Sequence, residues 1–432
     1  MKKITNFLFL FICLIIIGMM TSCAAADGSG DAYGGGYGGG YADTEAEIAG
    51  GYEDSKGDVP GASEEEPGEG SEDVESTITK IPAGQLTACA YSDNEKYLFW
   101  QGLLTTNQEG KGAFKDYADK FDFHTANRIK LQFPAKTYVK VELLDQEEKV
   151  IATTYSDASG VCYLYPNEVL DSYEVNLTYT DLNDEVITSR QTITGDSNFV
   201  LEAKELERKR IELMFVIDTT GSMGDELAYV KSEVEDVINR VAAANPNTEV
   251  LLSILCYRDV NDTYVTKYSD FSTDINVSKN FVSLESAGGG GDYEEAVHTA
   301  LLLANEKQWS DTATKIIIHI ADAPAHDYDV DDWNKAALAL ASKGVRIITV
   351  ASSGIDKKTE YFFRSQSVIT NGHYVYLTDD SGIGGSHLEA TVEERPVVEF
   401  LNDSLVRLIN GYHTGEMSEP VYYRNVMNQN QQ

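Results

Sequence analysis

The feature that most constrains the fold is a series of continuous apolar runs in the second half of the chain. The runs are IELMFVID (211–218), EVLLSILCY (249–257), TKIIIHIAD (314–322) and VRIITVAS (345–352), with HYVYLTD (373–379) as a shorter one. Such runs are typical of strands that are covered on both faces of a parallel sheet. Between them, apolar residues recur at helical spacing, at 227–241, 293–308 and 331–343, and again at 397–411. This alternation predicts an α/β domain with a doubly wound, mostly parallel sheet over residues 206–413.

The start of the chain predicts export. Two lysines precede an apolar run over residues 7–20, which is short for a membrane span and typical of a secretory signal over residues 1–22. The signal ends at Cys23 in the stretch MTSC and so resembles a bacterial lipoprotein signal, which implies lipidation of Cys23 and anchoring to a membrane. The alternative is an uncleaved N-terminal anchor. Both hypotheses place the remaining chain outside the cytoplasmic membrane, on the extracytoplasmic side.

Three further segments precede the α/β domain, and one follows it. Residues 23–80 contain the repeat YGGGYGGGY and an acidic run, and they predict a disordered tether. Residues 81–126 give a weak signal, with one amphipathic helix at 96–104 whose Trp100 is expected to pack against a neighbouring module. Residues 127–205 alternate in short β-rich runs separated by turns, which predicts a small antiparallel β-sandwich. Their strand rhythm is similar to that of carboxypeptidase-regulatory-like domains. Residues 414–432 are expected to be a polar tail.

Charge and cysteine content exclude some functions. The chain of 432 residues has a formal net charge of −36, which argues against nucleic-acid binding because phosphate contacts require basic patches. Cys89, Cys162 and Cys256 have no paired C-x-x-C spacing, so they do not indicate a zinc site. Cys256 lies in an apolar run and is expected to be a buried thiol. The sequence does not decide whether Cys89 and Cys162 form a disulfide.

Oxygen-bearing side chains follow the first apolar run at alternate positions. Asp218 ends the run, and Thr220 and Ser222 follow at i+2 and i+4, so an extended turn points all three to one side. One carboxylate and two hydroxyls form half of an all-oxygen shell that suits Mg²⁺ or Mn²⁺. Asp292, after four glycines, and Asp322, at the end of another run, are expected to complete the shell. Taken singly, each strand-end aspartate is a helix cap or a turn former, and Ser222 is a helix cap, but their co-occurrence favours a metal site.

The stretches DTTGSM, GGGGD and ADAP together resemble the von Willebrand factor A domain with its metal-ion-dependent adhesion site, over residues 210–412. The resemblance implies that Asp218, Thr220 and Ser222 form the first metal-binding loop and that Asp322 belongs to the third. Asp292 then stands where the family often has a threonine. The resemblance also implies that an acidic residue of a protein partner fills the open coordination position of the ion.

The aspartate at 292 adds a third carboxylate, which leaves a net charge of −1 around a divalent ion instead of zero. At an effective dielectric constant near 20, one extra charge about 4 Å away is worth roughly 4 kcal/mol. We therefore expect tighter metal binding and weaker capture of a partner carboxylate, unless Asp292 reaches the ion through water.

Two histidines and a glycine-rich segment lie near these loops. His319 is inside an apolar run and is expected to be a core residue, whereas His326 either lines the rim of the site or lies in a plain surface loop. Residues 377–394 form a glycine-rich loop that either shapes specificity or simply connects two elements.

The sequence thus favours a non-enzymatic, lipid-anchored module that uses Mg²⁺, with Mn²⁺ or Ca²⁺ as alternatives, to bind a protein partner. One other hypothesis is a scaffold of the cell envelope whose cation stiffens its loops. Another is a Mg²⁺-dependent phosphatase of the haloacid-dehalogenase-like type, which requires a second acid two residues after the nucleophile, where Thr220 stands. The spacing of the residues supports no Ser-His-Asp or Cys-His arrangement.

Overall fold

The computed structural model describes residues 81–105 and 113–429. The expected signal, Cys23 and the tether lie outside these residues. Among the residues that are described, no helix combines the length and the apolar character that a membrane span requires.

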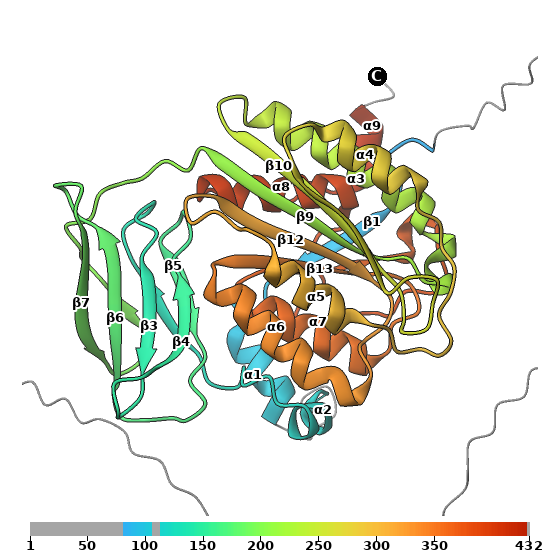
Figure 1. Ribbon diagram of the computed structural model, residues 1–432. Coiled ribbons are helices and arrows are strands. Elements are labelled where there is room, and N and C mark those ends of the chain that lie inside the picture. The colour runs from blue at the N-terminus through green and yellow to red at the C-terminus, as the bar shows by residue number, and fades with distance from the viewer. Residues whose placement is uncertain (1–80, 106–112, 430–432) are drawn as a thin grey trace, which may run out of the picture. The chain divides into compact units, whose positions relative to one another are not determined.

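The described residues contain one large central sheet (Figure 1). From one edge to the other its strands are β11 (Thr266–Ser272), β10 (Glu249–Tyr257), β9 (Arg210–Asp218), β12 (Thr314–Ala321), β13 (Val345–Ala351), β14 (Tyr374–Leu377), β1 (Thr87–Tyr91) and β15 (Glu399–Phe400). Neighbours from β10 to β14 pair in parallel, whereas β11 pairs antiparallel to β10, and β1 pairs antiparallel to β14 and β15. The prediction of a mostly parallel, doubly wound sheet is confirmed.

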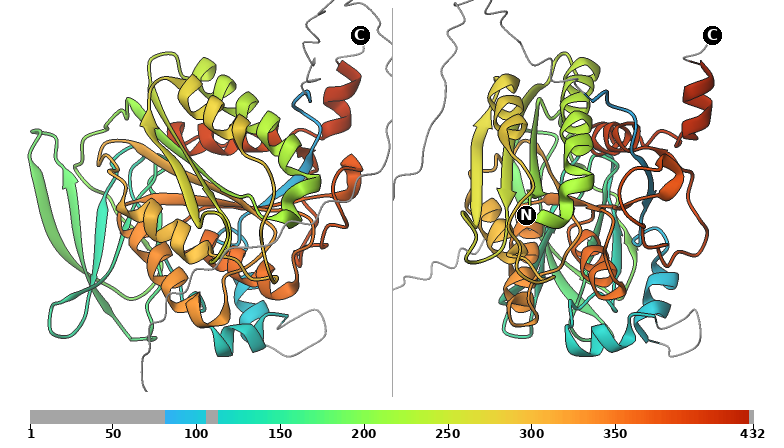
Figure 2. Two further views of the ribbon diagram at one scale, coloured as in Figure 1. Left: turned by 45° about the vertical axis from the view of Figure 1, so that its right-hand side comes forward. Right: turned by 90° about the vertical axis from the view of Figure 1, so that its right-hand side faces the viewer.

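Helices cover both faces of this sheet, as the two views in Figure 2 show. One layer consists of α3 (Leu227–Ala244), α4 (Ile275–Leu284) and α8 (Leu401–Thr414), and the other of α1 (Tyr97–Thr105), α5 (Val297–Glu306), α6 (Val330–Ser342) and α7 (Lys357–Ile369). Alternate residues of β9 serve the two layers: Phe215 packs with the first layer and Val216 with the second, and both are fully buried. This double coverage explains why the strand is apolar at consecutive positions.

The edge of the sheet includes a segment that the sequence analysis left outside the domain. Strand β1, from the weakly readable residues 81–126, pairs with β14 so that Ala88 lies opposite Leu377. Helix α1 follows it, and the Trp100 ring stacks on Tyr361 of α7 with 6.3 Å between ring centroids. Helix α2 (Lys115–Lys120) completes this segment. The central sheet therefore includes a strand from before the predicted boundary at 206. The sequence analysis did not find it because a five-residue strand carries too little periodicity to reveal partners that are distant in sequence.

The chain between β1 and β9 forms the expected small sandwich. One sheet contains β5 (Val161–Leu164), β2 (Ile129–Gln132) and β8 (Ser197–Asn198), and the other contains β4 (Val150–Tyr155), β3 (Lys140–Leu144), β6 (Tyr173–Thr180) and β7 (Val186–Ile193). Alternate residues such as Val141, Val175 and Leu177 are buried in the core between the sheets. All pairs are antiparallel except β2 with β8. In chain order, the sandwich is an insertion between two strands of the central sheet.

The structure also tests two smaller expectations. Cys89, Cys162 and Cys256 are free, buried thiols, so the possible disulfide is absent and Cys256 is buried as predicted. The expected polar tail contains helix α9 (Tyr423–Gln429), and Tyr423 packs against Phe400 with 5.7 Å between ring centroids. An aromatic contact to the domain therefore orders part of this tail.

Candidate metal site

The candidate site lies where the strand order reverses. From β9 the chain continues to β10 on one side and later to β12 on the other side, which makes the carboxyl ends of β9 and β12 the switch point of the sheet. Ligands of open α/β sheets bind at this position because the loops diverge there. Asp218 is the last residue of β9, and Asp322 directly follows β12.

The loop after β9 turns its polar side chains toward one point. The Asp218 Oδ1 accepts hydrogen bonds from the Thr220 amide (2.9 Å) and the Thr220 hydroxyl (2.7 Å). The Thr220 and Ser222 hydroxyl oxygens lie 3.2 Å apart. A hydroxyl that donates its proton still has lone pairs for a cation. Ser222 lies inside a short 3₁₀ helix (η1, Gly221–Asp225) and caps no α-helix, since α3 begins after Glu226.

Three buried carboxylate oxygens of these loops lack a hydrogen-bond partner. They are Oδ2 of Asp218, Oδ1 of Asp322 and Oε2 of Glu295. Their side chains are 0%, 3% and 2% exposed, respectively. Buried polar atoms in native proteins are almost always paired, so these unpaired acceptors call for a ligand that supplies positive charge.

The electrostatics of the three carboxyls support the same conclusion. Burial and the nearby charge of Asp322 raise the pKa of Asp218 well above its ordinary value. Burial raises the pKa of Asp322 as well, although the Ser222 hydroxyl opposes this shift. Burial and the charges of Asp218 and Asp259 raise the pKa of Glu295 to about 9. In each case burial is the largest cause, and neighbouring negative charges raise the pKa further.

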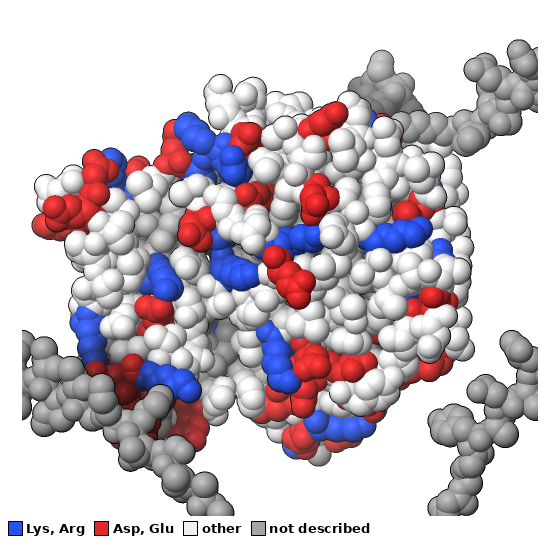
Figure 3. All heavy atoms as spheres, in the orientation of Figure 1, with Lys and Arg blue, Asp and Glu red and all other residues white. Residues whose placement is uncertain are grey.

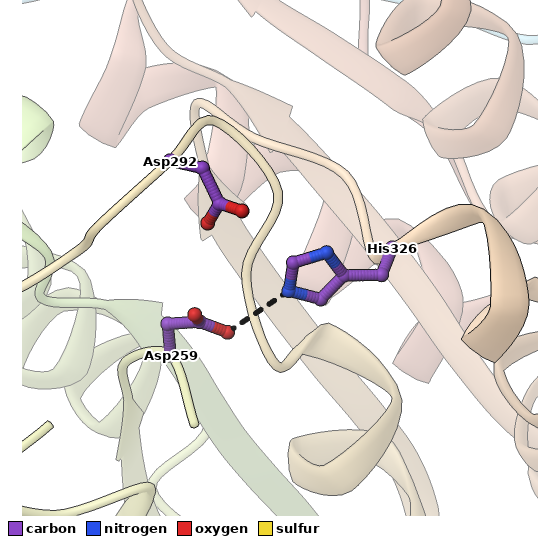
Figure 4. Close-up of side chains that lie close together, drawn as sticks. All are labelled: Asp259, Asp292 and His326. Atoms are coloured by element: carbon purple, nitrogen blue, oxygen red, sulfur yellow. Dashed lines mark hydrogen bonds and ion pairs between the residues drawn. The ribbon is translucent and has the colours of Figure 1, made fainter. Parts of the chain in front are cut away.

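Glu295, and not Asp292, carries the third buried carboxylate oxygen without a partner. The structure brings Asp218, Thr220, Ser222 and Asp322 together as expected, but the Asp292 side chain is exposed and lies in a different group. Its carboxylate is close to that of Asp259 and to the imidazole of His326 (Figure 4). The structure thus places Asp292 with Asp259 and His326, and its predicted part in the metal shell of Asp218 stays a prediction. Glu295, three residues later, is a buried acid that the sequence analysis did not single out.

The path of the glycine-rich loop explains this shift. Gly289 and Gly290 have positive φ angles of 80° and 76°, so the loop turns sharply before α5. The Gly289 carbonyl accepts a hydrogen bond from the Gly221 amide (3.2 Å), which fixes this loop to the first one. The Glu295 amide then bonds the Pro324 carbonyl (2.8 Å). These tertiary contacts decide which acid enters the site. The only sequence signal for Glu295 was its position directly before a helix with apolar spacing.

The glycine-rich segment 377–394 reaches the same edge of the sheet. The Glu226 carboxylate is fully buried and accepts a hydrogen bond from the Ser353 amide (3.2 Å). His387, from this segment, contacts Glu226 (2.9 Å) and Asp379 (2.8 Å). Burial lowers the pKa of His387, but the two carboxylates outweigh it, so that the net shift is upward. The segment is thus part of the rim of the site rather than a remote connection.

The two histidines near these loops differ in role. His319 is fully buried and lies within hydrogen-bond distance of the Tyr257 hydroxyl (3.0 Å), which confirms it as a core residue. His326 is at the rim, where its Nε2 lies 3.3 Å from Oδ1 of Asp259. On the face shown in Figure 3, basic and acidic side chains are interspersed, and no broad basic patch is visible there.

Comparison with known proteins identifies the central part of this fold. The family profile of the von Willebrand factor A domain matches residues 212–388. Residues 212–388 form a von Willebrand factor A domain. Domains of this family are generally protein-interaction modules without enzymatic activity, and they commonly bind a divalent metal. The matched residues include the whole group around Asp218 and also Asp259, Asp292 and His326.

Curated relatives share this domain over a limited part of their length. The chain is 24% identical over 171 residues to the alpha-protein kinase vwkA of Dictyostelium discoideum, which covers 39% of this chain and 27% of the relative. It is 26% identical over 185 residues to the putative ariadne-like RING finger protein R811 of Acanthamoeba polyphaga mimivirus, which covers 39% of this chain and 18% of that protein. The chain therefore spans about a quarter or less of these relatives. The terms kinase and RING finger come from the names of those two relatives and describe them alone.

Solved structures with a similar fold include the conserved hypothetical protein BatB from Bacteroides thetaiotaomicron. The similarity covers 38% of this chain and 89% of BatB, at 15% identity and a TM-score of 0.31.

Proposed function

We propose that this protein is a lipid-anchored, extracytoplasmic von Willebrand factor A module that holds a divalent cation and binds a protein partner through it. The observation that carries the proposal is the group of three buried carboxylate oxygens without partners at the switch point of the sheet. Mg²⁺ is the cation that suits this all-oxygen donor set best, and Mn²⁺ or Ca²⁺ are alternatives.

The residues that are present fit such an ion. Asp218 and Asp322 supply carboxylates from neighbouring strand ends, and the Thr220 and Ser222 hydroxyls supply lone pairs. Glu295 supplies the third acid in place of Asp292. Burial and the neighbouring negative charges raise the pKa of Asp218 and Glu295, and the cation would offset the repulsion between these charges. Ser222 is exposed, which leaves the ion accessible from solvent.

The third carboxylate affects what the ion can capture. Three carboxylates leave a net charge of −1 around a divalent ion, so they tighten metal binding and weaken attraction to an acidic partner group. This expectation applies to Glu295 instead of Asp292. We infer that the partner gains much of its affinity from contacts with the rim, including segment 377–394, and that the metal contributes orientation.

The proposed location depends on the first residues of the chain. The apolar run at 7–20 followed by Cys23 supports export and lipid attachment, and the Gly/Tyr-rich and acidic residues 23–80 support a tether between the lipid and the folded part. Labelling of cells with a fatty-acid analogue tests this point: wild type is expected to be labelled, and Cys23→Ala is not. Equal labelling of the two would contradict lipid attachment at this residue.

The metal is tested by thermal unfolding of the full chain after removal of divalent ions. Addition of Mg²⁺ is expected to raise Tm because the ion binds only the folded protein. Asp218→Asn is expected to abolish this increase, and Asp311→Asn, an exposed acid before the start of β12, is the matched control. An equal increase in wild type and in Asp218→Asn would contradict the metal site.

The partner is tested with the immobilised chain and an envelope extract, in the presence of Mg²⁺ or of a chelator. Proteins that bind wild type with Mg²⁺, but neither with chelator nor to Asp218→Asn, support metal-dependent binding. If the metal raises Tm but the bound proteins are the same in every condition, the ion only stiffens the loops, as in the scaffold hypothesis.

A further inference from the structure

We propose a second metal site in this domain, formed by Asp259, Asp292 and His326, which takes a first-row transition metal ion of the Zn²⁺ class. The three side chains lie outside the first group and come from three different loops. Asp259 follows β10, Asp292 lies in the glycine-rich loop before α5, and His326 follows β12.

The ligand atoms of these residues all lie within 4.8 Å of one another, and the side chains point toward a common centre (Figure 4). Metal–ligand bonds of about 2.0–2.2 Å in a tetrahedral site place ligand atoms about 3.4 Å apart. Nε2 of His326 and Oδ1 of Asp259 already lie 3.3 Å apart, so a cation requires mainly that the exposed Asp292 carboxylate moves closer, by up to about 1.4 Å. Two carboxylates and one imidazole leave at least one coordination position for water or another ligand.

The donor set distinguishes this site from the first one. Imidazole nitrogen favours Zn²⁺ and related ions, whereas Mg²⁺ and Ca²⁺ prefer oxygen alone. The first group offers carboxylates and hydroxyls, but the second offers a nitrogen from His326. The two sites should therefore differ in their metal preference.

The structure holds two of the three ligands in place. Asp259 is only 7% exposed, and its amide donates a hydrogen bond to Oδ2 of Asp262 (3.2 Å). The His326 ring stacks on Tyr328 with 5.0 Å between centroids and an angle of 7° between planes. Asp292 is exposed and lies beside an open hollow of ≈ 340 Å³ that residues 259–262 and 290–292 line, which gives an ion a path from solvent.

The test measures metal stoichiometry and spectrum on the full chain after removal of divalent ions. Equilibrium dialysis with Zn²⁺ is expected to give two bound ions per chain. Co²⁺ is expected to show the visible absorption of a nitrogen-ligated ion. His326→Gln and Asp292→Asn should each lose one Zn²⁺ or weaken its binding by at least about 10-fold, a loss that even outer-shell changes cause. Asp292 is exposed, so its variant is expected to fold normally.

Two control variants show whether the lost ion is held by His326 itself. His298→Gln removes another histidine that lies near a carboxylate, 3.5 Å from Asp329, and should leave both ions bound. Asp218→Asn should lose only the ion without the nitrogen spectrum. If His326→Gln and Asp292→Asn both keep the wild-type stoichiometry and spectrum, His326 and Asp259 form a simple ion pair and the second site does not exist. This conclusion does not depend on whether the first site binds a metal.

Discussion

At the scale of single residues, the acids near the switch point, such as Asp218 and Asp322, are buried away from water. Asp218 is completely buried, and its nearest hydrogen-bond donors belong to Thr220. Such an arrangement costs free energy in the folded state unless a cation is bound or a proton is taken up. This cost in free energy is confined to the switch point of the sheet. A cation that binds there removes the cost, which contributes to its affinity.

Replacement of Glu295 by glutamine tests its assignment as the third acid. Without cations, Glu295→Gln is expected to raise Tm at neutral pH, because burial raises the pKa of the native carboxyl to about 9 and folding must then supply it with a proton, which glutamine does not need. With Mg²⁺, the variant should bind about 10-fold more weakly or worse, since an amide oxygen carries no full charge. Calorimetric titration measures the affinity. Glu294→Gln is the control, because its carboxylate pairs with Lys358 at 2.9 Å; equal losses in both variants would contradict the assignment.

His319 gives a prediction on acid stability. Burial lowers the pKa of His319 to about 3, whereas the unfolded chain has a value near 6.5. Only the unfolded state binds the proton in that interval, so this residue's contribution to stability is lost as the pH falls below about 6.5. Between pH ~7 and pH ~5, wild type should lose about 2 kcal/mol more than His319→Gln. Urea unfolding at both pH values measures the difference, and identical losses would refute the prediction.

At the scale of elements, the glycine-rich loop decides the composition of the site. Its two left-handed glycines bring the loop onto the first one and turn Glu295 inward and Asp292 outward. A loop of four glycines has many possible paths, and hydrogen bonds to Gly221 and Pro324 select one of them. The two acids that follow these glycines, Asp292 and Glu295, therefore have different surroundings.

Two glycines of this loop are expected to differ in how well they tolerate a side chain. A Cβ atom at Gly289 would lie 2.3 Å from Oδ1 of Asp262, and the φ angle of 80° disfavours any other residue. Gly289→Ala is expected to cost about 1–3 kcal/mol and to weaken Mg²⁺ binding. Gly291→Ala is the matched control, because no heavy atom lies within 4 Å of its Cβ position. Urea unfolding of the two variants should show a clear difference, and equal stability would mean that the loop adapts.

At the scale of the whole molecule, segments far apart in sequence form one sheet. Strand β1 lies between β14 and β15, and the Thr87 hydroxyl lies 2.8 Å from that of Thr378, 291 positions later in the chain. A buried ion pair strengthens this connection: the fully buried Arg364 of α7 donates to Asp93, just after β1, from its Nε at 2.9 Å. Glu360 accepts from the same guanidinium at 3.0 Å. The segment before the sandwich is thus a structural part of the domain.

This connection predicts a large effect of a change distant from the site. Asp93→Ala leaves a buried arginine with only part of its charge balanced, and we expect it to cost about 3–5 kcal/mol. Glu95→Ala, two residues away and exposed, should be nearly neutral. Chemical denaturation measures both. A loss below about 1 kcal/mol for Asp93→Ala would show that the edge segment contributes little to the domain.

The sequence by itself determined the parts of this protein that depend on local pattern. Continuous apolar runs identified the parallel strands, and Asp218, Thr220, Ser222 and Asp322 were predicted to lie together because strand ends share one edge of the sheet. Only the tertiary structure decided that Glu295 is buried, that Asp292 lies close to His326, and that β1 completes the sheet. These results depend on the path of a glycine loop and on pairing between distant segments, which local pattern does not encode because the deciding contacts form only when the chain has folded.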